Sequence, residues 1–188
     1  MGMRNIVLLS LVVWSLSSFS AINLSIVDGA DVLAKAPIHQ TAEGKKGIVV
    51  VFLSAKCPCS DSHIVEVKSL HKDYPEFSFV AVNSNADETN ELAQDYFKRA
   101  GLEFPVIKDK NLELADRYKA FKTPHAFVMN SDGKVLYQGG VSSSRQFATA
   151  DRKFLREALM NIHDDKPVTM EEGRTLGCVI SRGEKNVW

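Results

Sequence analysis

Three cysteines carry the chemistry that this sequence offers. Cys57 and Cys59 flank Pro58 just after an apolar run, and Cys178 lies near the end of the chain. A thiolate can attack a disulfide sulfur or bind a soft metal ion, and a second thiol is needed to release the mixed disulfide that such an attack creates. The three residues therefore point to thiol–disulfide exchange centred on Cys57.

Cys57 lies between two predicted elements that would make its sulfur nucleophilic. The β-branched run 47–53 predicts a strand buried on both faces, and apolar residues at helical spacing predict a helix over 58–73. Proline is favoured in a first helical turn, so Cys57 is the expected N-cap. There the free backbone N–H groups and the helix dipole stabilise a thiolate, and Lys56 adds a nearby positive charge. We therefore expect the pKa of the Cys57 thiol to fall below about 8.5.

The remaining segments alternate between strand and helix patterns. Strands are expected at 22–27, 77–82, 104–107, 125–129 and 134–138, and helices around 92–100, 112–118 and 154–162. A polar stretch separates the first strand from Gly47, and residues 130–133 predict a hairpin turn. This order predicts an α/β fold in which a mixed sheet is covered by helices on both faces, with a C-terminal tail.

The first residues have the pattern of an export signal. Arg4 precedes the apolar run 6–14, and small residues surround a possible cleavage point after Ser20. An uncleaved anchor is the alternative, but a membrane span needs about 20 apolar residues. We therefore predict a signal peptide at 1–20, a domain at 21–165 and a tail at 166–188 that carries Cys178. From this signal the mature protein is expected to be exported to the periplasm, an oxidising compartment where cysteines can form disulfides, and to have no stable membrane span.

The composition excludes some classes of function. Lys and Arg together number 23, as do Asp and Glu, so the formal net charge is zero. Such a balance does not favour a nucleic acid partner. The sequence also lacks the glycine-rich loops that hold nucleotide phosphates.

Several segments together match a known pattern. They are 49–53 leading into Cys57-Pro58, then 79–83, 104–109, Thr123-Pro124, 127–135 and 177–180. Over about residues 47–162 the chain resembles the redoxin branch of the thioredoxin-like superfamily. That branch includes the alkyl hydroperoxide reductase/thiol-specific antioxidant proteins and the periplasmic thiol:disulfide oxidoreductases. The resemblance implies a three-layer thioredoxin-like fold. It also implies that Pro124 is a cis-proline packed against the reactive cysteine, and that Thr123 and Pro124 bind the substrate backbone.

The chain departs from the family's motifs at four positions. A Cys-x-x-Cys motif would place its second cysteine at Ser60, and the buried carboxylate of thioredoxin would fall at Val51. Peroxiredoxins carry a proline and a threonine where this chain has Val50 and Ser54. The resemblance therefore specifies the fold more closely than one activity.

Either remaining cysteine could resolve a mixed disulfide at Cys57. Residues two apart on a helix point in nearly opposite directions, so a Cys57–Cys59 bridge would need a distorted first turn. The tail is long enough to bring Cys178 to any face of the domain. We favour Cys178 as the partner of Cys57 or Cys59. The alternative is a purely structural bridge that pins the tail and leaves Cys59 as an inert buried thiol.

The histidines offer two further roles. His63, in the predicted helix after Cys57, could exchange protons with the cysteines, or could simply be solvated. Cys57, Cys59, His63 and His125 could also form a soft metal site for Cu(I) or Zn, although the histidines would more commonly be ordinary surface residues. We therefore expect no bound metal and no cofactor.

The leading hypothesis is an exported thiol:disulfide oxidoreductase in which Cys57 attacks and Cys178 or Cys59 resolves. Its partners would be protein thiols or disulfides, a small thiol or a peroxide, together with a separate electron donor. The alternatives are a peroxiredoxin-like thiol peroxidase, and a non-catalytic copper or protein binder with a structural disulfide.

Overall fold

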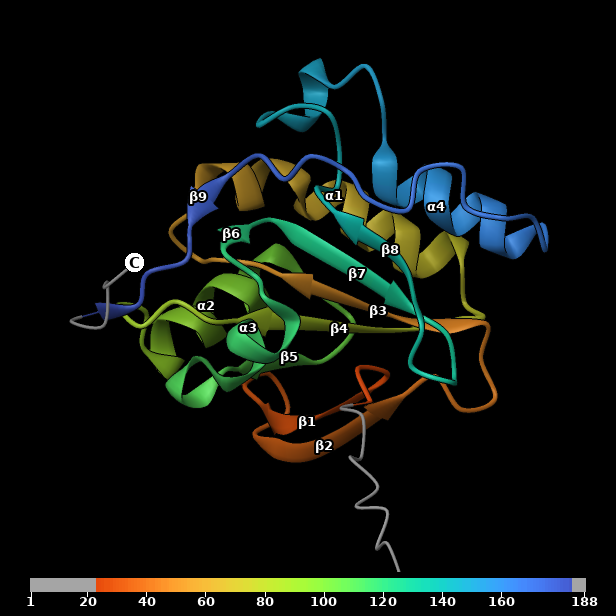
Figure 1. Cartoon of the computed structure of the whole chain (residues 1–188). Coiled ribbons are helices and arrows are strands. Elements are labelled where there is room, and N and C mark those ends of the chain that lie inside the picture. Colours follow the sequence, from red (N-terminus) through yellow and green to blue (C-terminus); the bar gives the residue numbers. More distant parts are fainter. Residues whose placement is uncertain (1–22, 184–188) are drawn as a thin grey trace, which may run out of the picture.

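The computed structural model describes residues 23–183 of the chain, and its centre is a seven-stranded mixed sheet (Figure 1). The predicted signal peptide at 1–20 lies outside the described residues. The strands of this sheet are β1 (Ile26–Asp31), β2 (Ala36–Thr41), β3 (Gly47–Phe52), β4 (Phe77–Asn83), β5 (Val106–Lys108), β7 (His125–Met129) and β8 (Val135–Gly139). Their spatial order is β2-β1-β5-β4-β3-β7-β8. The mixed sheet expected from the sequence is confirmed.

The three central strands run in the same direction. β3 pairs with β4 and β4 with β5 in parallel, whereas β7 pairs with β3 and β8 with β7 in antiparallel fashion. Every residue of β3 is buried, which explains its unbroken apolar sequence. The carboxyl ends of β3, β4 and β5 therefore open onto one edge of the sheet, where the loop after β3 leads into Cys57.

Helices cover both faces of the sheet. α1 (Pro58–Asp73), α2 (Asn90–Ala100) and α4 (Phe154–His163) contribute buried residues to one apolar core, and α3 (Glu113–Tyr118) contributes to the other. Short 3-10 turns lie at Lys110–Leu112 and Phe147–Thr149. Consecutive right-handed crossovers from β3 to β4 to β5 move in one direction across the sheet, so α1 and α2 share a face. The structure thus confirms the thioredoxin-like class of fold.

The segment before β3 differs from its expected form. The sequence indicated a strand at 22–27 followed by a polar stretch, whereas β1 and β2 form a hairpin at the edge of the sheet. Most residues of this hairpin are only half-buried or exposed. Its strands therefore lack the strong apolar signal that revealed β3.

The C-terminal tail, in blue in Figure 1, packs back onto the domain. It passes the edge strand β8, where the Gln138 N–H donates to the Glu171 carbonyl and the Gly173 N–H donates to the Gln138 carbonyl. Further along it forms β9 (Cys178–Val179), which pairs antiparallel with β6 (Lys122–Thr123). The sequence indicated no strand here. Among residues 23–183, no helix is long and apolar enough to cross a membrane.

Candidate active site

Cys57 caps the amino end of α1, as its position before Pro58 predicted. Its backbone is extended, with φ −90° and ψ 114°, and the Ser60 N–H points to its sulfur at 3.4 Å. The sulfur also lies 3.3 Å from the carbonyl oxygen of Thr123, which precedes Pro124 across a cis peptide bond. Only 3% of Cys57 is exposed. A negative charge on this sulfur would face the N–H groups and positive dipole end of α1.

Cys57 forms a disulfide with Cys178. Their Cα atoms are 6.0 Å apart although the residues are separated by 121 positions in the sequence. The pairing of β9 with β6 places Cys178 directly opposite Thr123. The tail thus brings its sulfur to the end of α1 by forming a short strand beside the loop that contains the cis-proline.

Cys59 is a free, buried thiol next to this disulfide. The sulfur atoms of Cys57, Cys59 and Cys178 all lie within 4.8 Å of one another. We expected Cys57 and Cys59 to point in nearly opposite directions, as two such residues do within a helix. That rule does not hold here because Cys57 is the extended N-cap and not a helical residue.

A buried carboxylate, which sequence analysis missed, organises the loop before Cys57. Glu88 is 3% exposed and lies in the loop between β4 and α2. Its oxygens accept hydrogen bonds from the backbone N–H groups of Ala55 at 2.9 Å and Lys56 at 3.3 Å. They also accept from the Ser54 hydroxyl at 2.5 Å and the Asn83 amide at 2.6 Å. Glu88 therefore fixes the backbone from which Cys57 follows.

We predict that Glu88→Gln destabilises this loop and the protein. The glutamine amide would place N–H donors where the loop presents only donors, leaving buried groups unpaired. The expected loss is about 2–3 kcal/mol of unfolding free energy, measured by urea denaturation. Glu91→Gln is the matched control, because Glu91 is an exposed residue in the first turn of α2. Equal stability of the two variants would contradict the role of Glu88.

His63 is buried and not solvated. Its Nδ1 lies 2.7 Å from the Cys59 carbonyl oxygen, and its Nε2 lies 2.7 Å from the Ser142 hydroxyl. A carbonyl can only accept a hydrogen bond, so Nδ1 carries the proton and Nε2 accepts from Ser142. Burial lowers the pKa of His63, which favours this neutral form. Both ring nitrogens are thus engaged, and the ring ties the first turn of α1 to the segment after β8.

His125 follows the cis-proline but does not join the cysteine cluster, which contains no histidine among the described residues. It is 5% exposed, and its ring packs against the rings of Phe121 and Phe127. The structure therefore does not assemble the mixed cysteine–histidine set suggested as a metal site. Burial lowers the pKa of His125 from 6.5 to about 4.

This buried histidine predicts a loss of stability in acid. An unfolded chain protonates His125 near pH 6.5 but the folded chain only near pH 4. The unfolded state then binds more protons between these values, so the stability contributed above pH 6.5 is lost as pH falls toward 4. Between pH 7 and pH 4 the unfolding free energy of the wild type should fall because His125 is buried. In His125→Gln this fall should be smaller by about 2–3 kcal/mol. Denaturant titrations at each pH measure this difference.

His39→Gln provides the control for that titration. His39 is largely exposed and pairs with Asp28 on the β1–β2 hairpin. Its removal should leave most of the acid sensitivity in place. Stability curves for His125→Gln that run parallel to those of the wild type would contradict the prediction.

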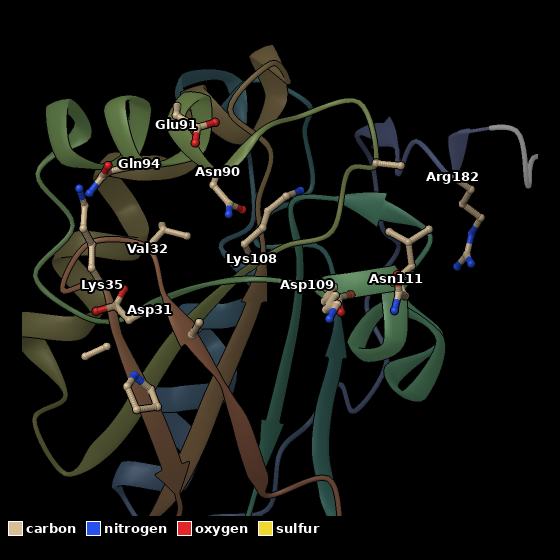
Figure 2. A pocket seen from close by; sticks show the side chains of 16 residues that line it. Asp31, Val32, Lys35, Asn90, Glu91, Gln94, Lys108, Asp109, Asn111 and Arg182 are labelled. Atoms are coloured by element: carbon tan, nitrogen blue, oxygen red, sulfur yellow. The ribbon is translucent and has the colours of Figure 1, made fainter.

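A cleft of about 1270 Å³ lies at the edge of the sheet where β4 and β5 end (Figure 2). It is formed by the β1–β2 turn, the start of α2 and the segment after β5, with Arg182 of the tail at one end. Both acidic and basic side chains line it, namely Asp31, Glu91, Asp109, Lys35, Lys108, Lys110 and Arg182. The Lys108 ammonium already donates to the Asn85 carbonyl at 2.7 Å and the Asn83 side chain at 2.9 Å. None of the three cysteines lines this cleft.

Comparison with known sequences identifies a protein family and several relatives. The model of the family described as Redoxin matches residues 27–154. The thiol-disulfide oxidoreductase ResA of Halalkalibacterium halodurans is 27% identical over 99 residues, which cover 52% of this chain and 56% of that protein. The sporulation thiol-disulfide oxidoreductase A of Bacillus subtilis is 27% identical over 96 residues, covering 50% and 58%. The chain thus matches little more than half the length of these curated relatives.

Solved structures show the same fold. An uncharacterized conserved protein from Geobacillus kaustophilus superposes with a TM-score of 0.75 at 25% identity, covering 85% of this chain and 90% of that one. StoA from Bacillus subtilis superposes with a TM-score of 0.52 at 20% identity, covering 60% and 85%.

Proposed function

The chain belongs to the Redoxin family, and from this membership and its cysteine geometry we propose that it is an exported thiol:disulfide oxidoreductase. Cys57 is the attacking residue and Cys178 the resolving one. The observation that carries the proposal is the disulfide between these residues at the amino end of α1, beside the loop with the cis-proline. A purely structural bridge would not need a sulfur held against free helix N–H groups.

The reaction proceeds in two exchanges. In the reduced protein, the Cys57 thiolate attacks one sulfur of a substrate disulfide and expels the other as a thiolate. The Cys178 thiolate then attacks Cys57 and expels the second substrate thiolate. The protein dithiol has become the Cys57–Cys178 disulfide and the substrate has gained two electrons. The reverse sequence oxidises a substrate dithiol, and a separate dithiol or disulfide partner resets the protein.

The end of α1 favours Cys57 as the group that attacks and leaves. Its thiolate would be stabilised by the Ser60 N–H and by the helix dipole, and a stabilised thiolate is the better leaving group. Both ring nitrogens of His63 are hydrogen-bonded, so proton exchange with a cysteine would require one of these two bonds to open. Thr123 and Pro124 are the proposed substrate-binding residues, because the Thr123 backbone flanks the reactive sulfur.

Trapping tests this assignment. Reduced Cys178→Ser protein is mixed with a peptide disulfide, and the products are mapped by mass spectrometry without reduction. The expected product is a long-lived mixed disulfide between Cys57 and the peptide, since the resolving thiol is gone. Cys57→Ser protein should yield none. A Cys57–Cys59 disulfide in place of the mixed disulfide would instead make Cys59 the resolving thiol.

Two alternatives have different support. The three neighbouring sulfurs favour Cu(I) binding by the reduced protein as a second candidate function, because thiolates are the ligands that Cu(I) prefers. A Cu(I) titration of reduced protein without stoichiometric binding would remove it. Peroxide reduction ranks lower, because the Ser54 hydroxyl, the one group kept from the peroxiredoxin pattern, already donates to Glu88.

A further inference from the structure

The tail occupies the backbone position that the proposed function gives to a substrate. β9 pairs with β6 in antiparallel register, with Val179 opposite Lys122 and Cys178 opposite Thr123. The Cys178 sulfur is at the same time bonded to Cys57. A substrate chain in a mixed disulfide with Cys57 and paired with Thr123 would need the same space. The tail and the substrate therefore exclude one another.

Contacts beyond the disulfide hold the tail in this position. Ile180 is fully buried in the core beneath α3, and its N–H donates to the Phe121 carbonyl at 3.0 Å. The Ser181 N–H donates to the Asn85 side-chain oxygen at 2.8 Å, and its carbonyl accepts from the Ala86 N–H at 2.9 Å. One apolar anchor, Ile180, thus lies two residues after Cys178, and hydrogen bonds of the Ile180 and Ser181 backbone hold it in place.

Gly177, the residue before Cys178, makes the closest approach to the site. A Cβ atom added there would collide with the Thr123 carbonyl oxygen and would lie 2.7 Å from its carbonyl carbon. It would also lie 3.3 Å from the nitrogen of Pro124. These are backbone atoms on either side of the cis peptide bond, so they cannot move aside as a flexible side chain would. A strand bound in this register must have glycine before its cysteine.

We infer that residues 177–180 are a tethered mimic of the substrate, and that the preferred substrate is an extended peptide with glycine before its cysteine and an apolar residue two positions after it. This inference rests on the proposed function. The tail has to leave β6 before such a peptide can pair there. After the peptide has formed its mixed disulfide with Cys57, the returning tail competes for β6 and delivers the Cys178 thiolate, which expels the peptide thiolate.

Opening the tail requires a reductant and then a competition. A dithiol supplies the two electrons and two protons that convert the Cys57–Cys178 disulfide into two thiols, and the dithiol becomes a disulfide. The reduced tail is still tethered, and a short flexible tether gives an effective concentration of about millimolar. A substrate peptide therefore binds faster when the tail is loosened, which gives the inference two independent tests.

The first test measures the preference for glycine. The protein is the full chain with Cys59→Ser and Cys178→Ser, so that Cys57 is its single thiol. The probes are a peptide with the sequence of residues 175–182, the same peptide with valine for its glycine, and N-acetylcysteine, each carrying thionitrobenzoate on its cysteine sulfur. Attack by Cys57 forms a disulfide with the probe and releases coloured thionitrobenzoate. The rate of each probe with the protein is divided by the rate of the same probe with free glutathione, which corrects for the intrinsic reactivity of the probe.

The glycine peptide is expected to react at least about tenfold faster than the valine peptide, a factor equivalent to about 1.4 kcal/mol.

The second test adds Ile180→Ser to the same protein. This substitution removes the buried anchor and should raise the rate with the glycine peptide several-fold. Val179→Ser is its matched control, because Val179 is the neighbouring β-branched residue and is 57% exposed. Circular dichroism verifies that each variant remains folded.

The outcomes separate this inference from the proposed function. Suppose that the N-acetylcysteine probe still reacts faster with the protein than with free glutathione. Equal rates for the two peptides, or equal rates for Ile180→Ser and Val179→Ser, would then overturn the inference that the tail mimics the substrate. No accelerated reaction with any probe would instead overturn the role of Cys57 as nucleophile, and the inference with it.

Discussion

Replacing Cys57 with serine is expected to reduce disulfide exchange to its uncatalysed rate, a loss of about 1,000-fold or more. The serine hydroxyl is not ionised at neutral pH and cannot form the mixed disulfide through which the reaction passes. The serine would still occupy the position at the end of α1, so the loss of activity can be assigned to the sulfur and not to a change in its surroundings. Insulin reduction in the presence of dithiothreitol, followed by turbidity, measures the rate.

Val65→Ser is the matched control for this experiment. Val65 lies on the same helix with 66% of its surface exposed, and it is not part of the cysteine cluster. Its activity should stay near that of the wild type. Exchange that survives in Cys57→Ser would transfer the nucleophilic role to Cys59 or Cys178 and would end the present assignment.

Removing the disulfide should have the largest effect on stability. The bridge joins residues 121 positions apart, so it restricts a long loop in the unfolded chain. The loop-entropy relation gives about 4–5 kcal/mol for such a closure. Under oxidising conditions, Cys178→Ser protein should therefore unfold at a lower urea concentration than the wild type, with a difference in unfolding free energy of about this size.

Reduction provides an internal control. Dithiothreitol should lower the stability of the wild type by a similar amount and leave Cys178→Ser unchanged, because the variant has no such disulfide to lose. A difference below about 1 kcal/mol between oxidised and reduced wild type would contradict the prediction. Packing of Ile180 and the β6–β9 pairing would then account for the attachment of the tail.

The parts of the fold and site that could be predicted are those with strong local signals. The apolar run of β3 and the position of Pro58 placed Cys57 at the amino end of α1, because burial on both faces and a proline in the first turn leave distinct patterns. The hairpin β1–β2 and the short strands β6 and β9 were missed. They are edge or two-residue elements, and most of their residues are only partly buried.

Glu88 shows why part of the site stayed hidden. Between Asp87 and Thr89 it resembles an ordinary solvated turn, and nothing local distinguishes it from its exposed neighbours. Its burial follows from the pairing of β3 with β4, which brings the loops after these two strands together at one sheet edge. The three hydrogen bonds to residues 54–56 exist only in that arrangement.

The sequence by itself determined the position of Cys57, the proposed nucleophile, at the start of its helix, since a cysteine before a proline at the end of a buried strand is a local arrangement of neighbouring residues. It left open which thiol would be the partner of Cys57. Only the tertiary structure decided that, by pairing the tail with β6 and burying Ile180 so that Cys178 lies opposite Thr123. Contacts across 121 positions depend on the packing of the whole domain, and no short segment of sequence encodes them.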